Sequence, residues 1–137
     1  MSCRKELPSL IDMAFLIADD SQQKIDFLQS FLKHARWDGD VLIAHTTEEA
    51  MRLIDAHPDI GFAFIDYYIP SGNGPSVIRY LTEKNPSARI ALVSSSDKLS
   101  NQTEAKNAGA ETCICTSYEE PVVKDAILGL LEQWKAE

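Results

Sequence analysis

The stretch FAFIDYYIP, residues 62–70, decides the fold class of this chain. Its first four residues are apolar without interruption, which is typical of a strand buried on both faces of a parallel sheet. Asp66 follows directly, and Pro70 and Gly74 indicate a loop before the next helical segment. Because ligands of open parallel sheets bind beyond the carboxyl ends of the strands, we expect Asp66 to lie in a functional crevice.

Short apolar runs like this one recur along the chain and alternate with segments of helical period. The five runs cover residues 13–18, 41–45, 62–65, 89–94 and 112–115. Five strand–helix units predict an α/β fold, a five-stranded parallel sheet with helices on both faces. The first and third runs are nearly unbroken, so we expect them at the centre of the sheet. Residues 97–108 offer only Leu99 and small alanines for burial and predict a weakly held helix.

The composition suits one acidic domain. The chain has 137 residues, 45% of them hydrophobic, which is enough for a buried core. Its net charge of −8 argues against direct binding of nucleic acid, since that needs clustered cations. Three cysteines without disulfide-framework spacing favour a reducing, cytoplasmic location, and no early apolar run is long enough to cross a membrane. We expect residues 1–12 to form an N-terminal arm and residues 13–137 to form the domain.

Polar side chains follow the predicted strands at one edge of the sheet. Asp19 and Asp20 follow the first strand, Asp66 the third, Ser94 ends the fourth and Thr116 follows the fifth. Two carboxylates about 4 Å apart repel by about 4 kcal/mol at an effective dielectric constant of about 20, so three in one crevice need a cation. Mg²⁺ prefers such hard oxygen ligands and bridges carboxylates to phosphate oxygens. The residues therefore predict an Mg²⁺ site in which one carboxylate can attack a phosphoryl group.

Four segments together resemble the receiver domain of bacterial two-component response regulators. They are LIADDS at residues 16–21, FIDYYIP at residues 64–70 with Gly74, VS at residues 93–94, and AGA at residues 108–110. The resemblance extends from about residue 13 through nearly all of the remaining chain. It implies a flavodoxin-like (βα)5 receiver fold and a role in phosphorelay signal transduction.

The resemblance also implies roles for individual residues. Asp66 would accept a phosphoryl group from a histidine kinase or a histidine phosphotransfer protein. Asp19 and Asp20 would hold Mg²⁺ with Asp66 and the backbone carbonyl of Tyr68, and the Ser94 hydroxyl would bind the phosphoryl group and pull its loop inward. The domain would assist its own phosphorylation and dephosphorylation as a signalling domain, not as an enzyme. It would contact a downstream effector protein, or form a homodimer, through the face of its fourth helix, fifth strand and fifth helix.

The sequence departs from the family pattern at several positions. Thr116 stands where a lysine is usual, and Cys113 stands where an aromatic residue is usual. We therefore expect the fixed cation to be missing, with Lys98 nearby but solvated, and Mg²⁺ to bind more tightly than in relatives that carry the lysine. Tyr68 and Ser95 are also unusual and are expected to narrow the access of water to a phosphorylated acceptor.

Two alternatives follow from these departures. The chain can be an atypical receiver that acts by protein contacts without phosphorylation, or, with less support, a phosphatase-like enzyme with an aspartyl nucleophile. A nucleotide-binding domain of similar topology fits poorly, because no glycine after the first strand admits a pyrophosphate. The survival of Asp19, Asp20, Asp66 and Ser94 favours a working phosphoacceptor.

Overall fold

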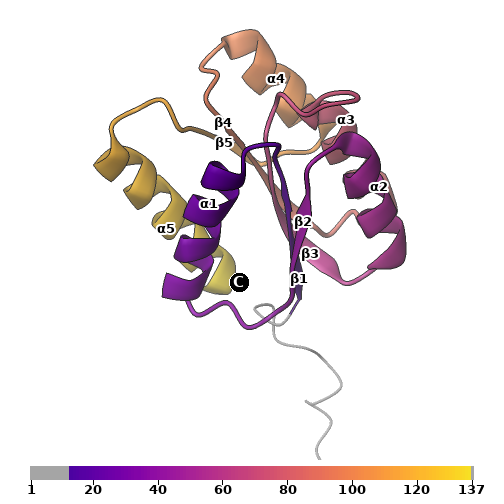
Figure 1. The fold of residues 1–137 in the computed structure, drawn as a ribbon, viewed down its shortest axis with the longest axis horizontal. Coiled ribbons are helices and arrows are strands. Elements are labelled where there is room, and N and C mark those ends of the chain that lie inside the picture. Colours follow the sequence, from indigo (N-terminus) through magenta and orange to yellow (C-terminus); the bar gives the residue numbers. More distant parts are fainter. Residues whose placement is uncertain (1–12, 137) are drawn as a thin grey trace, which may run out of the picture.

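The computed structural model describes residues 13–136, in which five strands and five helices alternate along the chain. All strand pairs are parallel and form one sheet in the order β2-β1-β3-β4-β5 (Figure 1). This arrangement confirms the predicted (βα)5 fold. The elements are β1 (Ala14–Ala18), α1 (Gln22–His34), β2 (Val41–Ala44), α2 (Thr47–Ala56), β3 (Ile60–Ile65), α3 (Gly74–Lys84), β4 (Arg89–Ser94), α4 (Leu99–Ala108), β5 (Thr112–Cys115) and α5 (Glu120–Ala136).

The strands β1 and β3 lie inside the sheet, as the sequence predicts. Every residue of both strands is buried, because helices cover the two faces of the sheet. Ala18 at the end of β1 pairs with Ala44 of β2 and with Ile65 of β3. This register brings the residues that follow β1 and β3, Asp19 and Asp66, to the same edge of the sheet.

The helices α1 and α5 cover one face of the sheet (Figure 1). This face holds a cluster of aromatic rings. The Phe15 ring lies 5.3 Å from Trp37 and 4.8 Å from Phe64 between ring centroids. Trp134 of α5 lies 5.2 Å from Phe62 and is fully buried. Edge-to-face and tilted pairs of this kind add to the burial energy of the rings, so α1 and α5 are firmly attached to the sheet.

The opposite face, covered by α2, α3 and α4, is packed with aliphatic side chains. Neighbouring residues of β1 point to opposite faces, so Leu16 and Ala18 belong to this layer whereas Phe15 and Ile17 belong to the aromatic one. The two layers together form the core that holds the strand ends in place.

The helix α4 is the least firmly held element of the described chain. The N-caps of α1, α2 and α3 each accept a backbone hydrogen bond through their side chains, but Lys98 at the start of α4 makes no such side-chain bond. Only Asn101, Ala105 and Ala108 of this helix are buried. Leu99 is 76% exposed, so the expectation that it would be buried is wrong.

The predicted N-terminal arm, residues 1–12, lies outside the described residues and stays a prediction. Within residues 13–136, none of the helices has both the length and the apolar character that a membrane crossing requires.

Candidate functional site

The two central strands deliver buried carboxylates to one edge of the sheet. The Asp19 N–H donates to the Ala44 carbonyl oxygen at 2.9 Å, and the Asp66 N–H donates to the Ala18 carbonyl oxygen at 2.9 Å. These bonds extend the sheet by one residue and fix both backbones. Asp19 is 2% and Asp66 9% exposed, whereas Asp20 lies at the surface. One ligand oxygen of each carboxylate lies within 4.8 Å of the other two, so the structure brings the predicted carboxylates together.

The loop between β3 and α3 is tied closely to the backbone of Asp66. The Gly74 N–H donates to the Tyr67 carbonyl oxygen at 2.7 Å, and a Cβ atom on Gly74 would collide with the Asp66 carbonyl oxygen. A glycine is therefore required at this position. On the other side of the loop, Thr47 of α2 donates from its backbone N–H to the Pro70 carbonyl oxygen and from its hydroxyl to the Ser71 carbonyl oxygen. The loop is thus held at both of its ends.

Ser94 and Thr116 complete the edge of the sheet from β4 and β5. Ser94 is 1% exposed, and its hydroxyl accepts a hydrogen bond from the Ser96 N–H at 3.2 Å. The same hydroxyl lowers the pKa of Asp66. The Thr116 N–H donates to the Ser94 carbonyl oxygen at 2.9 Å, so Thr116 lies beside Ser94 on the neighbouring strand. The order of the strands alone accounts for this placement.

A residue that the sequence analysis missed, Lys24 of α1, reaches into the carboxylates. Its Nζ lies 2.8 Å from Asp19 Oδ2 and 3.3 Å from Asp66 Oδ1, and it donates to the Val93 carbonyl oxygen at 2.5 Å. The expectation that the crevice lacks a fixed cation is therefore wrong. Lys98 is exposed, as expected, and is not the substitute.

The helical period carried a signal for Lys24. It precedes Leu28 by four residues and Phe31 by seven, and both are buried. A lysine on the buried stripe of a helix either loses its charge or finds a carboxylate. Because α1 begins directly after Asp19 and Asp20, a carboxylate partner was available close by.

The electrostatics of the crevice centre on Asp66. Burial raises the pKa of Asp66 above its usual value and the Asp19 carboxylate raises it further, while the Lys24 ammonium and the Ser94 hydroxyl lower it. The rise from burial outweighs the other effects. Ionisation of Asp66 therefore costs free energy in the folded protein, and a bound cation would lower that cost.

The three carboxylates suit a divalent cation. The three ionised carboxylates and the Lys24 ammonium together carry a net charge of −2. Carboxylate oxygens are ligands of the kind that Mg²⁺ prefers. Burial of Asp19 and Asp66 and the raised pKa of Asp66 are typical of a functional site. The donor set thus fits the predicted metal.

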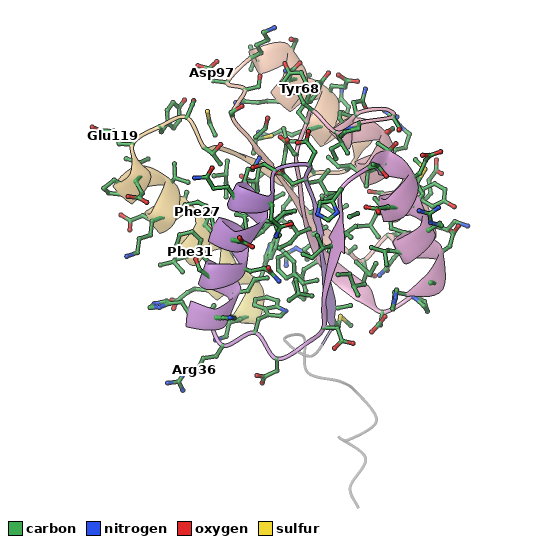
Figure 2. The ribbon with its side chains drawn as sticks, viewed as in Figure 1. Phe27, Phe31, Arg36, Tyr68, Asp97 and Glu119 are labelled. Atoms are coloured by element: carbon green, nitrogen blue, oxygen red, sulfur yellow. The ribbon has the colours of Figure 1, made fainter. Side chains whose placement is uncertain are left out.

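Two tyrosines after Asp66 link the site to α4, and Figure 2 labels the second, Tyr68, near that helix. The Tyr67 hydroxyl donates to Glu104 Oε1 at 2.7 Å. Asn101, which is 8% exposed, donates from Nδ2 to the Tyr68 hydroxyl at 3.2 Å and to Ser96 Oγ at 2.9 Å. A chain of polar contacts therefore connects the crevice to a helix that has few apolar contacts of its own.

Cys113 stands on β5 near the same helix. Its Sγ lies 3.9 Å from the Gln102 carbonyl oxygen, and burial raises the pKa of its thiol. A neutral thiol in this position packs as a small apolar group.

The fold and the acidic crevice define an open α/β domain whose chemistry lies at the carboxyl ends of β1, β3 and β4. The response regulator receiver domain family matches residues 15–128, which is most of the chain. The chain belongs to this family, and it is a signalling domain, not an enzyme in the usual sense. No curated protein sequence matches the chain significantly.

Solved structures of receiver domains share the fold. A response regulator from Burkholderia pseudomallei, described with a phosphorylated aspartic acid, a calcium ion and citrate, is 24% identical with a TM-score of 0.71, over 91% of this chain and 72% of that one. A CheY-like receiver domain from Methanospirillum hungatei JF-1 is 22% identical with a TM-score of 0.74, over 90% and 97%. The Mn²⁺-bound response regulator Rcp1 is 16% identical with a TM-score of 0.76, over 89% and 94%.

Proposed function

We propose that this receiver domain accepts a phosphoryl group on Asp66 from a histidine kinase or a histidine phosphotransfer protein. In the reaction an Asp66 carboxylate oxygen attacks phosphorus, the P–N bond to the donor histidine breaks, and the histidine leaves. The observation that carries the proposal is the surrounding of Asp66, a buried carboxylate next to two more carboxylates, an ammonium and a hydroxyl. These groups match a phosphoacceptor site better than a structural ion pair.

The same residues support dependence on Mg²⁺. Asp19, Asp20 and Asp66 would hold the ion together with the backbone carbonyl of Tyr68. When bound, Mg²⁺ offsets the charge of the carboxylates and draws phosphoryl oxygens toward them. The metal-bearing relatives named above contain Ca²⁺ and Mn²⁺, and our proposal of Mg²⁺ rests on the oxygen donors of this chain.

The signal would leave the site through Ser94. A phosphoryl group on Asp66 would offer oxygens to which the Ser94 hydroxyl can donate a hydrogen bond. Ser94 is in turn joined through Ser96 to Asn101 of α4. A shift of Ser94 therefore changes the contacts that hold α4. We place the docking surface for a downstream effector protein on the face of α4, β5 and α5.

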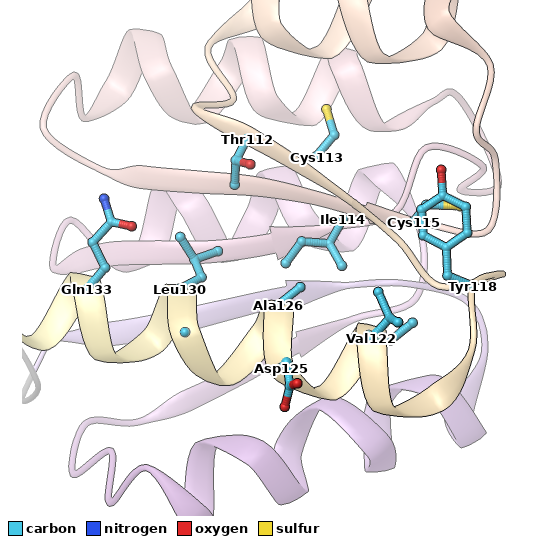
Figure 3. Close-up of a pocket in the computed structure, with 12 residues that line it drawn as sticks. Thr112, Cys113, Ile114, Cys115, Tyr118, Val122, Asp125, Ala126, Leu130 and Gln133 are labelled. Atoms are coloured by element: carbon cyan, nitrogen blue, oxygen red, sulfur yellow. The ribbon is translucent and has the colours of Figure 1, made fainter.

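That face carries exposed apolar side chains and a groove (Figure 3). Tyr118 is 56% and Val122 52% exposed, and both line the groove between β5 and α5 together with Ile114 and Leu130. Exposed aromatic and branched side chains are common anchors for a protein partner. A second copy of the domain is the other occupant that this surface would admit.

The test is the mass of the intact protein after incubation with a small acyl phosphate. In the presence of Mg²⁺ the purified chain should gain one phosphoryl group without any kinase, which would also show that the domain assists its own phosphorylation. Chelation of Mg²⁺ and the Asp66→Asn variant should each abolish the gain. A wild-type mass that stays unchanged, or an Asp66→Asn variant that still gains a phosphoryl group, would refute the proposal.

The second candidate is an atypical receiver that acts by contacts alone, favoured by Thr116 and Cys113 in place of the usual residues. It predicts no gain of mass and an effector affinity that Asp66→Asn leaves unchanged. The phosphatase-like alternative instead predicts turnover of a generic phosphomonoester. The presence of Lys24 beside Asp66 weakens the case for a receiver that acts by contacts alone, because Lys24 supplies the positive charge that Thr116 does not.

A further inference from the structure

We infer that Lys24 of α1 is the fixed cation of the phosphoryl site, binding a phosphoryl oxygen on Asp66 and weakening Mg²⁺ binding before transfer. This inference rests on the proposed function of Asp66. It assigns to the first helix a charge that the family resemblance places at the end of the fifth strand, where this chain has Thr116.

The position of the Lys24 ammonium is fully determined by its contacts. A lysine ammonium has three N–H donors, and here three acceptors surround it, which are Asp19 Oδ2, Asp66 Oδ1 and the Val93 carbonyl oxygen. The side chain is 16% exposed, so water screens these contacts only partly. The ammonium lies 3.3 Å from Asp66 Oδ1, close enough to contact a phosphoryl group bonded on that side of the carboxylate.

The start of α1 fixes the approach of Lys24. Ser21 caps the helix by accepting a hydrogen bond from the Lys24 N–H at 3.2 Å, and the Ser21 N–H itself donates to Asp19 Oδ1 at 2.9 Å. The backbone of Lys24 is thus anchored one contact away from the carboxylate that its ammonium binds. This closed loop of contacts positions the lysine before any ligand arrives.

Lys24 and a metal ion would compete for the same oxygens. Asp19 Oδ1 is engaged by Ser21 and Asp19 Oδ2 by Lys24, so a cation that binds Asp19 must share an oxygen with one of them. The ammonium also repels a divalent cation. Under this inference Mg²⁺ would bind less tightly than the missing lysine at position 116 suggests, because Lys24 already offsets part of the carboxylate charge.

The same charge would favour the phosphorylated product. With an acyl phosphate as donor, an Asp66 oxygen forms a bond to phosphorus, the P–O bond to the acyl group breaks, and a carboxylate leaves. Negative charge on the phosphoryl oxygens then lies beside Asp66, where the Lys24 ammonium can bind it while keeping all of its protons. Preorganised charge of this kind is a large contributor to catalysis.

The experiment removes the charge and keeps the length of the side chain. Lys24→Met should be phosphorylated by an acyl phosphate about 10- to 100-fold more slowly than wild type, the range expected for loss of a hydrogen bond between charged groups. Its Mg²⁺ affinity, measured by titration calorimetry, should rise at least threefold. Lys33→Met removes an exposed lysine from the same helix and should change neither value.

The opposite signs of the two effects separate the assigned role from a structural one, because a distorted site would lose both activities. A Lys24→Met variant with an unchanged phosphorylation rate, or with weaker Mg²⁺ binding, would overturn the inference. Should Lys24→Met fail to fold, Lys24→Gln carries the same two expectations. If wild type itself takes no phosphoryl group, the proposed function fails, and a rise in Mg²⁺ affinity in Lys24→Met would still support the competition between lysine and metal.

Discussion

The two faces of the sheet are packed with different kinds of side chain. On the α1–α5 face, five large rings pack together around Phe15 and Trp134. On the other face, α4 buries only Asn101 and two alanines and depends on hydrogen bonds from the loop after β3. The first face gains its stability from apolar burial, whereas part of the second relies on polar contacts that can be exchanged.

The difference shows how one crevice can be both fixed and responsive. The face covered by α1 and α5 supplies Lys24, whose helix packs against the aromatic layer. The hydrogen bonds at the start of α4 supply the route from Ser94 through Ser96 to Asn101. Segments with few buried apolar contacts open and shift at low free energy, so α4 is the element that can respond to a change at Asp66.

The largest expected effect is a loss of stability on the face covered by α1 and α5. Trp134→Ala should lower the free energy of unfolding by about 3–5 kcal/mol, because it removes a fully buried ring and its hydrogen bond to Glu111 Oε2 at 3.1 Å. Urea denaturation measures the loss. Tyr118→Ala removes an exposed ring from the same region of the chain and should change the value by less than about 1 kcal/mol. Equal losses in the two variants would contradict the comparison.

A smaller effect, of opposite sign, is expected at Asp66. Its pKa is raised in the folded protein, so the folded state binds a proton more tightly than the unfolded state. The contribution of Asp66 to stability is therefore fully present below the usual pKa of 3.8 and is lost as the pH rises through the raised pKa. Asp66→Asn should remove this fall and be more stable than wild type near neutral pH.

The measurement is urea denaturation of Asp66→Asn and wild type between pH 4 and pH 7.5, without Mg²⁺. The gap between the two free energies of unfolding should widen as the pH rises. A gap that is constant over this range, or a wild type that is the more stable protein at neutral pH, would show that burial does not govern the ionisation of Asp66.

The next expected effect is local to α4. Asn101→Ala removes the two hydrogen bonds that join α4 to Tyr68 and Ser96, at a cost of about 1 kcal/mol. Amide hydrogen exchange should become faster in residues 99–108 and stay unchanged in α1 and α5. Faster exchange throughout the domain would show that α4 is not an independent unit.

The smallest effect concerns Leu99. This residue is 76% exposed, so Leu99→Ala should change the free energy of unfolding by less than about 0.5 kcal/mol. Thermal or urea denaturation checks it. A loss of the size typical of a buried leucine would mean that Leu99 contributes to the core.

The fold followed from hydrophobic period because the strands and the helices other than α4 each have an apolar pattern of their own. The unbroken runs of β1 and β3 reflect burial on both faces, and their central positions follow from it. The carboxylates could be grouped because parallel strands end at a common edge. These inferences need only local sequence and the rules of sheet topology.

The contacts of long side chains could not be inferred in the same way. Lys24 reaches Val93, 69 residues away, and Tyr67 reaches Glu104, 37 residues away. Such pairs depend on the relative placement of helices and on side-chain rotamers, which a periodic pattern does not specify. The usual family position of the lysine is at Thr116, and the family pattern does not point to a lysine on α1.

We expect α4 to sense a phosphoryl group on Asp66. Amide hydrogen exchange tests this when it is measured in wild type and in Asp66→Asn, with and without Mg²⁺ and beryllofluoride, which is a stable mimic of the phosphoryl group. We expect altered exchange in residues 95–108 of wild type, no change in the aromatic core of α1 and α5, and no response in Asp66→Asn. The same response in Asp66→Asn, or a wild-type response confined to α1 and α5, would contradict it.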